Sequence, residues 1–260
     1  MHLSFDLYPS YLRAFEGSFD TTGAFRLNYQ IHAMRNYAYR TEDGRRLGPF
    51  PQVRNEGSLA LSRSAQDINA DRCSLDVQHT RSWSTWTNQD HASKQTLRAR
   101  LNYQNDTFGS LNDWHFSYAS EPILPVKSYR YNQLGPMQRS GQVVDQQIEL
   151  SGPADRAPLQ QRAHAPVTSL YSLIERLQSA SLKAGKVDYL DDLSMFRPGQ
   201  ELCALPTQEL EIDGSAQELH GYALVGPALV PLYFWMDRAK RVLAIIGHNV
   251  AYTLIEAETL

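Results

Sequence analysis

The stretch YFWMDRAKRVLAIIGHNVAYTLIEA, residues 233–257, contains three apolar runs separated by two short polar segments. Apolar runs of this length, bounded by turn residues, are typical of consecutive β-strands joined by tight hairpins. Asp237 stands where the first turn begins, a position that suits Asp because its carboxylate accepts hydrogen bonds from the following amides. We therefore interpret Asp237 as a hairpin residue, with a nucleophile or a cation ligand as the alternative. On this interpretation Asp237→Asn costs about 1 kcal/mol or less.

The same strand pattern recurs along most of the chain. In KQTLRARLNY, residues 94–103, Leu97, Ala99 and Leu101 alternate with polar residues, as they would in a strand with one wet face. Residues 209–226 read as two strands joined at Asp213-Gly214, and residues 128–150 read as a second pair with a longer link around Gly135-Pro136.

Helical periodicity is clear in one segment. Leu170, Leu173, Ile174 and Leu177 repeat at helical spacing, which predicts a helix within residues 166–183. Thr168 or Ser169 would cap its start, and Gly185 would follow its end. A second, short helix is predicted over residues 188–199, ending at Pro198-Gly199.

These patterns predict an all-β protein: a large curved antiparallel sheet, either a half-barrel or a sandwich, with one main helix packed on it. We expect residues 1–260 to form a single β-rich domain. It would comprise an N-terminal block of strands (1–150), a linker rich in proline and polar residues (151–166), and a helix with a C-terminal sheet (167–260).

Composition narrows the function classes. The 260 residues carry a formal net charge of -3, and the basic residues are scattered, so we do not expect a nucleic-acid partner. No apolar run is long enough for a transmembrane segment, and the N-terminus lacks the pattern of a signal peptide. A cytoplasmic protein or a mature exported form would both look this way. We expect Cys73 and Cys203 to be separate thiols rather than a bridged pair.

The last third of the chain resembles a known type of protein. The segment from Gly226 to Asp237 (GPALVPLYFWMD), the strand RVLAIIG, the terminal AYTL and the DDLSMFRPGQEL segment resemble uncharacterised bacterial β proteins labelled as domains of unknown function. The resemblance covers residues 168–257 and implies a curved antiparallel sheet like the half-barrels of periplasmic lipoprotein carriers. It implies no catalytic residue.

Two clusters are candidate sites. In HTRSWSTWTNQDH, residues 79–91, Trp83 and Trp86 with Arg81 would form a stacking surface for a ligand, unless the tryptophans pack in the core. Asp113 and His115 fall on one face of a strand and could act as a base and its orienting group. The alternative is that Asp113 is a loop residue and His115 a half-buried histidine.

Metal and nucleotide chemistry receive no support from the sequence. The eight histidines form no ligand motif, the acidic cluster Asp188, Asp191 and Asp192 suits a helix start as well as a cation, and no phosphate-binding loop is present. We therefore expect no metal and no cofactor.

The leading functional hypothesis is a binding protein for an apolar or amphipathic small molecule. Its pocket would be lined by aromatic residues, namely Trp83, Trp86, Trp114, Tyr233 and Trp235. The alternative is a carbohydrate-active hydrolase or lyase that uses Asp113, His115 or Asp237 in an aromatic-lined groove. A structural subunit without a small-molecule site is the third possibility. The sequence does not indicate the oligomeric state.

Overall fold

The computed structural model describes residues 11–20, 22–33, 39–40, 46–47, 54–69, 71–84, 92–122, 137–152, 159–179, 184–247 and 250–260. Within these ranges the chain is dominated by strands, with one α-helix, α1 (Leu170–Ser179), and a short 3-10 helix over Ala65–Asp67. The strands are β1 (Phe25–Ala33), β2 (Tyr39–Arg40), β3 (Arg46–Leu47), β4 (Arg54–Arg63), β5 (Arg72–Ser84), β6 (Ala92–Gln104), β7 (Leu111–Pro122), β8 (Met137–Val144), β9 (Gln147–Leu150), β10 (Leu159–Arg162), β11 (Val167–Ser169), β12 (Gly185–Asp191), β13 (Met195–Ile212), β14 (Ser215–Gly226), β15 (Leu229–Met236), β16 (Val242–Ile246) and β17 (Val250–Thr259).

Fifteen of these strands form one sheet, in the order β10-β9-β8-β7-β6-β5-β4-β1-β17-β16-β15-β14-β13-β12-β11. Almost all neighbours in the chain are neighbours in the sheet, so consecutive antiparallel hairpins build it, as the sequence predicts. The N-terminal and C-terminal strand blocks meet where β1 pairs with β17. β11 and β12 form the parallel pair at one edge.

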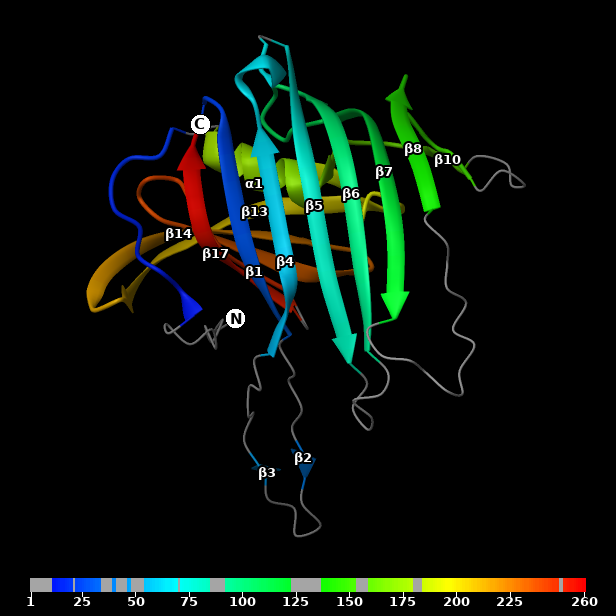
Figure 1. Cartoon of the computed structure of the whole chain (residues 1–260). Coiled ribbons are helices and arrows are strands. Elements are labelled where there is room, and N and C mark those ends of the chain that lie inside the picture. The colour runs from blue at the N-terminus through cyan, green and yellow to red at the C-terminus, as the bar shows by residue number, and fades with distance from the viewer. Residues whose placement is uncertain are drawn as a thin grey trace.

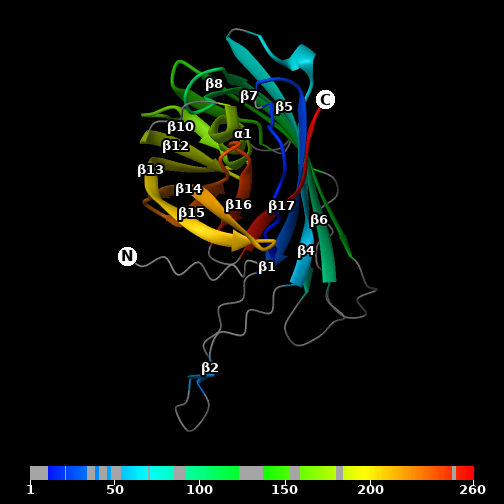
Figure 2. The same cartoon turned by 90° about the vertical axis from the view of Figure 1, so that its left-hand side faces the viewer.

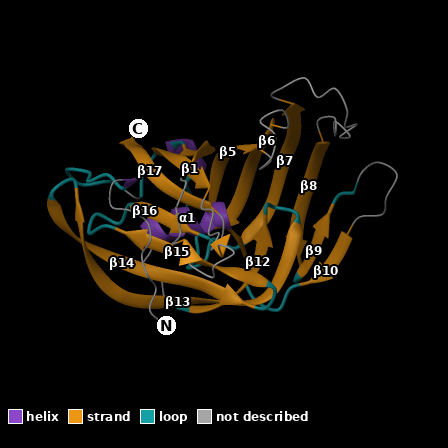
Figure 3. Ribbon diagram, turned by 90° about the horizontal axis from the view of Figure 1, so that it is seen from below, coloured by secondary structure: helices purple, strands orange, loops and turns teal. Residues whose placement is uncertain are grey.

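The sheet curves around α1 (Figure 1). Seen from below, β12 to β15 lie across from β5 to β7, with the helix between them (Figure 3), and the view in Figure 2 shows the same arrangement. At the closure, β11 contacts β7, so β8, β9 and β10 extend beyond the point where the curved sheet meets itself. The predicted all-β fold with one main helix is confirmed.

The two faces of the sheet differ as the alternating sequence predicts. Leu97, Leu101 and Tyr103 of β6 are buried on the inner face, whereas Arg98 and Arg100 between them are exposed on the outer face. The inner face and α1 share one hydrophobic core. This single core is what burial of one face of a long antiparallel sheet requires.

The main helix begins where its capping residue was predicted. The amide of Ser172 donates to Oγ of Ser169 at 3.2 Å, and the amide of Ser169 donates to Oγ of Ser172 at 3.0 Å. Every residue from Leu170 to Gln178 is buried, the charged Glu175 and Arg176 included. The helix therefore fills the interior of the curved sheet and exposes almost none of its surface.

The predicted helix over residues 188–199 is wrong. This segment is a hairpin, in which β12 ends at Asp191 and β13 begins at Met195. Asp192 and Leu193 form its turn with φ values of 46° and 57°. The spacing of Leu190, Leu193 and Phe196 suits a helix, but pairing with neighbouring strands overrides this weak local signal.

Other predicted connections have mixed outcomes. The turn at Asp213-Gly214 is confirmed between β13 and β14. The hairpin of residues 137–150 turns at Asp145-Gln146, and the link predicted around Gly135-Pro136 lies outside the described residues. Part of the predicted linker is a strand, because β10 pairs with β9. No helix in the described part of the chain is long and apolar enough to cross a membrane.

Candidate functional site

A partly open hollow lies between the inner face of the sheet and the turn that joins β12 to β13. We call it the inner-face pocket. Its volume is about 220 Å³. Its lining consists of His79, Arg81, Gln95, Leu97, Phe116, Tyr118, Met137, Asp192 and Ser194.

Strand register places four of the lining residues in one row. His79 pairs with Leu97, Leu97 with Tyr118, and Tyr118 with Met137, so four neighbouring strands each contribute one inward residue. Cross-strand neighbours on one face lie close enough for their side chains to form a continuous surface. The row therefore forms an apolar floor with His79 at one end.

A tryptophan holds the opposite wall in place. Nε1 of Trp114 on β7 donates to the carbonyl of Leu193 at 3.1 Å, and Leu193 is the central residue between Asp192 and Ser194. The Trp114 ring is buried against Gly141, where an added Cβ would lie 2.1 Å from the ring. Trp114 thus fixes the turn that presents Asp192 and Ser194 to the pocket.

A hydrogen-bond network lies at the buried end of the pocket. Nε of Arg81 donates to Nε2 of His79 at 2.9 Å, and Nη2 of Arg81 donates to the hydroxyl of Tyr252 at 2.7 Å. Because Nε2 of His79 accepts, the network assigns its proton to Nδ1, which faces the Tyr171 hydroxyl at 2.9 Å. These bonds join β5, α1 and β17 and fix the direction of the guanidinium.

The electrostatics of this network keep His79 neutral. Burial lowers the pKa of His79 well below its usual range, and the Arg81 charge lowers it further. Burial alone would lower the pKa of Arg81, but Tyr252 and Asp192 raise it above its usual value. The surrounding protein raises the pKa of Asp192 by desolvation, against the opposing effect of Arg81, although 51% of the Asp192 side chain remains exposed.

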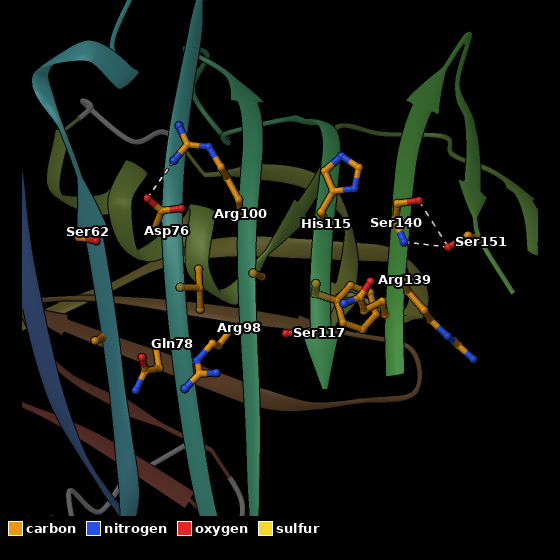
Figure 4. Close-up of a pocket in the computed structure, with 15 residues that line it drawn as sticks. Ser62, Asp76, Gln78, Arg98, Arg100, His115, Ser117, Arg139, Ser140 and Ser151 are labelled. Carbon is orange, nitrogen blue, oxygen red and sulfur yellow. Dashed lines mark hydrogen bonds and ion pairs between the residues drawn. The ribbon is translucent and has the colours of Figure 1, made fainter. Parts of the chain in front are cut away.

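A larger but more open hollow lies on the outer face of β4 to β8 (Figure 4). We call it the outer trough. Its volume is about 720 Å³, and Asp76, Arg98, Arg100 and His115 are among its lining residues. Asp76 accepts from Arg100 at 2.8 Å, so that carboxylate is already paired. The trough lacks the buried polar network of the inner-face pocket, and we therefore take the smaller pocket as the candidate site.

The predicted acid–base pair is on the outer face. Asp113 accepts from Nδ2 of Asn102 at 2.6 Å, and His115 is exposed in the outer trough. The two residues share a face, but within the described part of the chain no hydrogen bond joins them to each other. Neither lines the inner-face pocket, and a catalytic role for them stays a prediction.

Among the described residues, the predicted aromatic residues Trp114, Tyr233 and Trp235 are not in the lining of the inner-face pocket. Trp114 donates to the turn that carries Asp192 and Ser194. Trp235 is buried over Gly221, and Tyr233 is half-buried against the core. The side chain of Trp83 and the whole of Trp86 lie outside the described residues, and their predicted ligand contacts stay untested.

Asp237 occupies the predicted hairpin. Its amide donates to the carbonyl of Arg241 at 3.1 Å, and its carboxylate accepts from the amide of Arg241 at 2.8 Å and from Nε of the same residue at 2.7 Å. Asp237 and Arg241 are both buried. A structural pair of this kind accounts for Asp237, and its candidate catalytic role stays a prediction.

The acidic cluster divides into three separate roles. Asp188 accepts backbone amides of His164, Ala165 and Gly199, Asp191 pairs with Arg197, and Asp192 faces the inner-face pocket. Among the described residues, no three metal-binding side chains come together. Cys73 and Cys203 are free thiols, so they are not bridged.

Part of this site was visible in the sequence. His79 and Arg81 belong to the aromatic and polar stretch of residues 79–91, and Leu97 belongs to the predicted buried face of β6. Asp192 and Ser194 were missed as pocket residues, because they reach the pocket through a hairpin more than a hundred residues further along the chain. No local pattern indicates that contact.

The comparisons with known proteins bear on the fold. No protein-family model matches the chain, and no curated protein sequence matches it. The chain is similar to the crystal structure of a β-barrel-like protein of domain of unknown function DUF1849 from Brucella abortus. The TM-score is 0.54 at 8% sequence identity, and the match covers 94% of this chain and 100% of that chain. This likeness extends well beyond the last third of the chain, and it shows that the chain has a β-barrel-like all-β fold.

Proposed function

We propose that this protein binds a small amphipathic molecule in the inner-face pocket. The observation that carries the proposal is the juxtaposition of an apolar row with a fixed guanidinium in one hollow. Ligand sites commonly combine apolar walls with a few polar groups whose directions are set by the protein. The β-barrel-like relative is consistent with a binding protein of this shape.

The volume limits the size of the ligand. About 220 Å³ is below the ~300–1,000 Å³ of most drug-sized pockets, so the pocket suits a small ligand or one end of a larger molecule. Leu97, Phe116 and Met137 would contact its apolar part. Arg81, Asp192 and Ser194 would contact its polar part.

A pocket-filling variant tests the proposal. Octanol serves as the probe, and isothermal titration calorimetry measures its binding to the wild type and to Met137→Trp. Since the indole would occupy the pocket, we expect the variant to lose octanol binding while keeping the strand content of the wild type by circular dichroism. Val144→Trp, on the same strand but exposed, is the matched control and should bind octanol as the wild type does. Equal binding by Met137→Trp and the wild type would place any octanol site elsewhere.

A further inference from the structure

The guanidinium of Arg81 is held by neutral partners. Nε donates to the neutral imidazole of His79 and Nη2 donates to the hydroxyl of Tyr252. These two bonds fix the group without offsetting its charge. Three quarters of the Arg81 side chain is withdrawn from solvent, and a buried cation requires a close anion for stability.

Its carboxylate partner is held loosely. Oδ2 of Asp192 lies 3.7 Å from Nη1 of Arg81, which is beyond the range of a charge-assisted hydrogen bond. Asp192 is half-exposed on a hairpin turn, and the next carboxylate along the chain, Asp191, is already paired with Arg197 at 2.9 Å. Within the described residues, Asp192 is the single carboxylate in ion-pair contact with Arg81. An anion that reached Nη1 directly would be a stronger partner than Asp192.

The apolar row begins beside this position. Gln95 pairs with Arg81, and Leu97, Phe116, Tyr118 and Met137 continue the lining away from it. A bound molecule with its charged end at Arg81 would therefore place its apolar part against these side chains. The available volume is about seven times the ~30 Å³ that one water molecule occupies in the liquid, which accommodates a short alkyl chain.

We propose that the inner-face pocket selects amphiphiles that carry a carboxylate, which takes the place of Asp192 at Nη1 of Arg81. This inference rests on the proposed binding function and adds the class of ligand. On this proposal Arg81 and Asp192 have opposite effects on the affinity for the ligand. Arg81 attracts the ligand, whereas the Asp192 carboxylate competes with the ligand and repels it.

The test compares octanoate, octanol and octylamine by isothermal titration calorimetry near neutral pH. We expect the wild type to bind octanoate about tenfold or more tightly than octanol, and octylamine most weakly, because a charge-assisted bond at Arg81 favours the anion. Asp192→Asn should bind octanoate more tightly than the wild type does. Arg81→Gln should lose the preference for octanoate over octanol.

The control variants distinguish a failure of the carboxylate inference from a failure of the proposed binding function. Arg81→Lys keeps the positive charge and should retain part of the preference, and a role of Arg81 in stability alone would weaken octanol and octanoate equally. Equal binding of octanoate and octanol by the wild type, or weaker octanoate binding by Asp192→Asn, would overturn the carboxylate inference. If octanol binding were still lost in Met137→Trp, the proposed binding function would stand. Failure of all three ligands to bind would overturn both proposals.

Discussion

At the scale of single residues, Asp237 is a turn residue that is buried together with its partner Arg241. Arg241 donates to Asp237 from the same hairpin, and its other donors reach the carbonyls of Phe15 and Glu16 at 2.9 and 3.2 Å. The guanidinium also lies over the Phe15 ring. Arg241 thereby joins the hairpin to the N-terminal segment.

We expect Asp237→Asn to lower the free energy of unfolding by about 3–5 kcal/mol, because it leaves the buried Arg241 without its carboxylate. This is larger than the cost of about 1 kcal/mol or less that a surface turn would carry. Urea denaturation measures the difference. The control is Asp213→Asn, in an exposed turn of the same sheet. A loss equal to that of the control would show that the pair contributes little.

The sequence predicts where Asp237 lies in the fold, but it does not predict the contacts that surround it. The position of the hairpin is local information, and the DRAK segment after an apolar strand is enough to locate it. Arg241, the partner of Asp237, donates to carbonyls more than two hundred residues away, and no local pattern indicates these contacts. For the same reason His79 and Arg81 were visible as an unusual polar stretch, but their contact with Asp192 was not.

His79 predicts a pH dependence of stability. Burial lowers its pKa in the folded protein, so below the unfolded value of 6.5 the unfolded chain binds a proton that the folded chain does not. Stability is therefore full above about pH 6.5 and falls as the pH drops below it. The slope contributed by His79 reaches about 1.4 kcal/mol per pH unit. His32, whose pKa burial also lowers, acts in the same direction.

Urea denaturation between about pH 7.5 and pH 5.5 measures this slope. His79→Gln keeps a polar side chain but cannot titrate, so the slope should decrease. His115→Gln, at an exposed position, serves as the control and should keep the wild-type slope. An unchanged slope in His79→Gln would contradict the assignment of a neutral, buried His79.

At the scale of elements, α1 combines a predicted helix with an unpredicted environment. The spacing of Leu170, Leu173, Ile174 and Leu177 locates the helix correctly. The same amphipathic pattern predicts a solvent-exposed polar face, yet that face is enclosed. Glu175 forms buried ion pairs with Arg63 of β4 and with Arg176 beside it, and Nη1 of Arg176 donates to Asn105. The charged side chains of this helix face therefore bond to other residues of the protein instead of to water.

We expect Leu173→Ala to lower the free energy of unfolding by about 2–5 kcal/mol, through lost burial and the cavity left in a closely packed interior. The midpoint of urea denaturation measures this loss. Met195→Ala, at an exposed position, should change stability by no more than about 0.5 kcal/mol. Equal midpoints for the two variants would show that α1 is not packed in the core.

At the scale of the whole molecule, one sheet joins the two halves of the chain. β1 pairs with β4 on one side and with β17 on the other, and the N-terminal and C-terminal strand blocks share a single core. The sequence predicts the strands and their antiparallel order, since neighbours in the chain pair with one another. It does not predict the contact between β11 and β7, because that contact depends on the curvature of the whole sheet.

We propose that the chain unfolds as one cooperative unit. Far-ultraviolet circular dichroism and tryptophan fluorescence should then report the same denaturation midpoint, since Trp114 and Trp235 lie in different strand blocks of the shared core. Two separate midpoints would indicate two independently stable units.

The central claim is that a small amphiphile binds in the inner-face pocket, and methionine methyl resonances test it most directly. The chain has five methionines, of which Met137 lines the pocket, Met236 is buried elsewhere and Met195 is exposed. Octanoate is titrated into protein labelled with ¹³C at the methionine methyl groups, and Met137→Leu assigns the pocket resonance. We predict a saturable shift of the Met137 resonance, with those of Met195 and Met236 unchanged. Saturable octanoate binding that leaves the Met137 resonance in place would contradict the account.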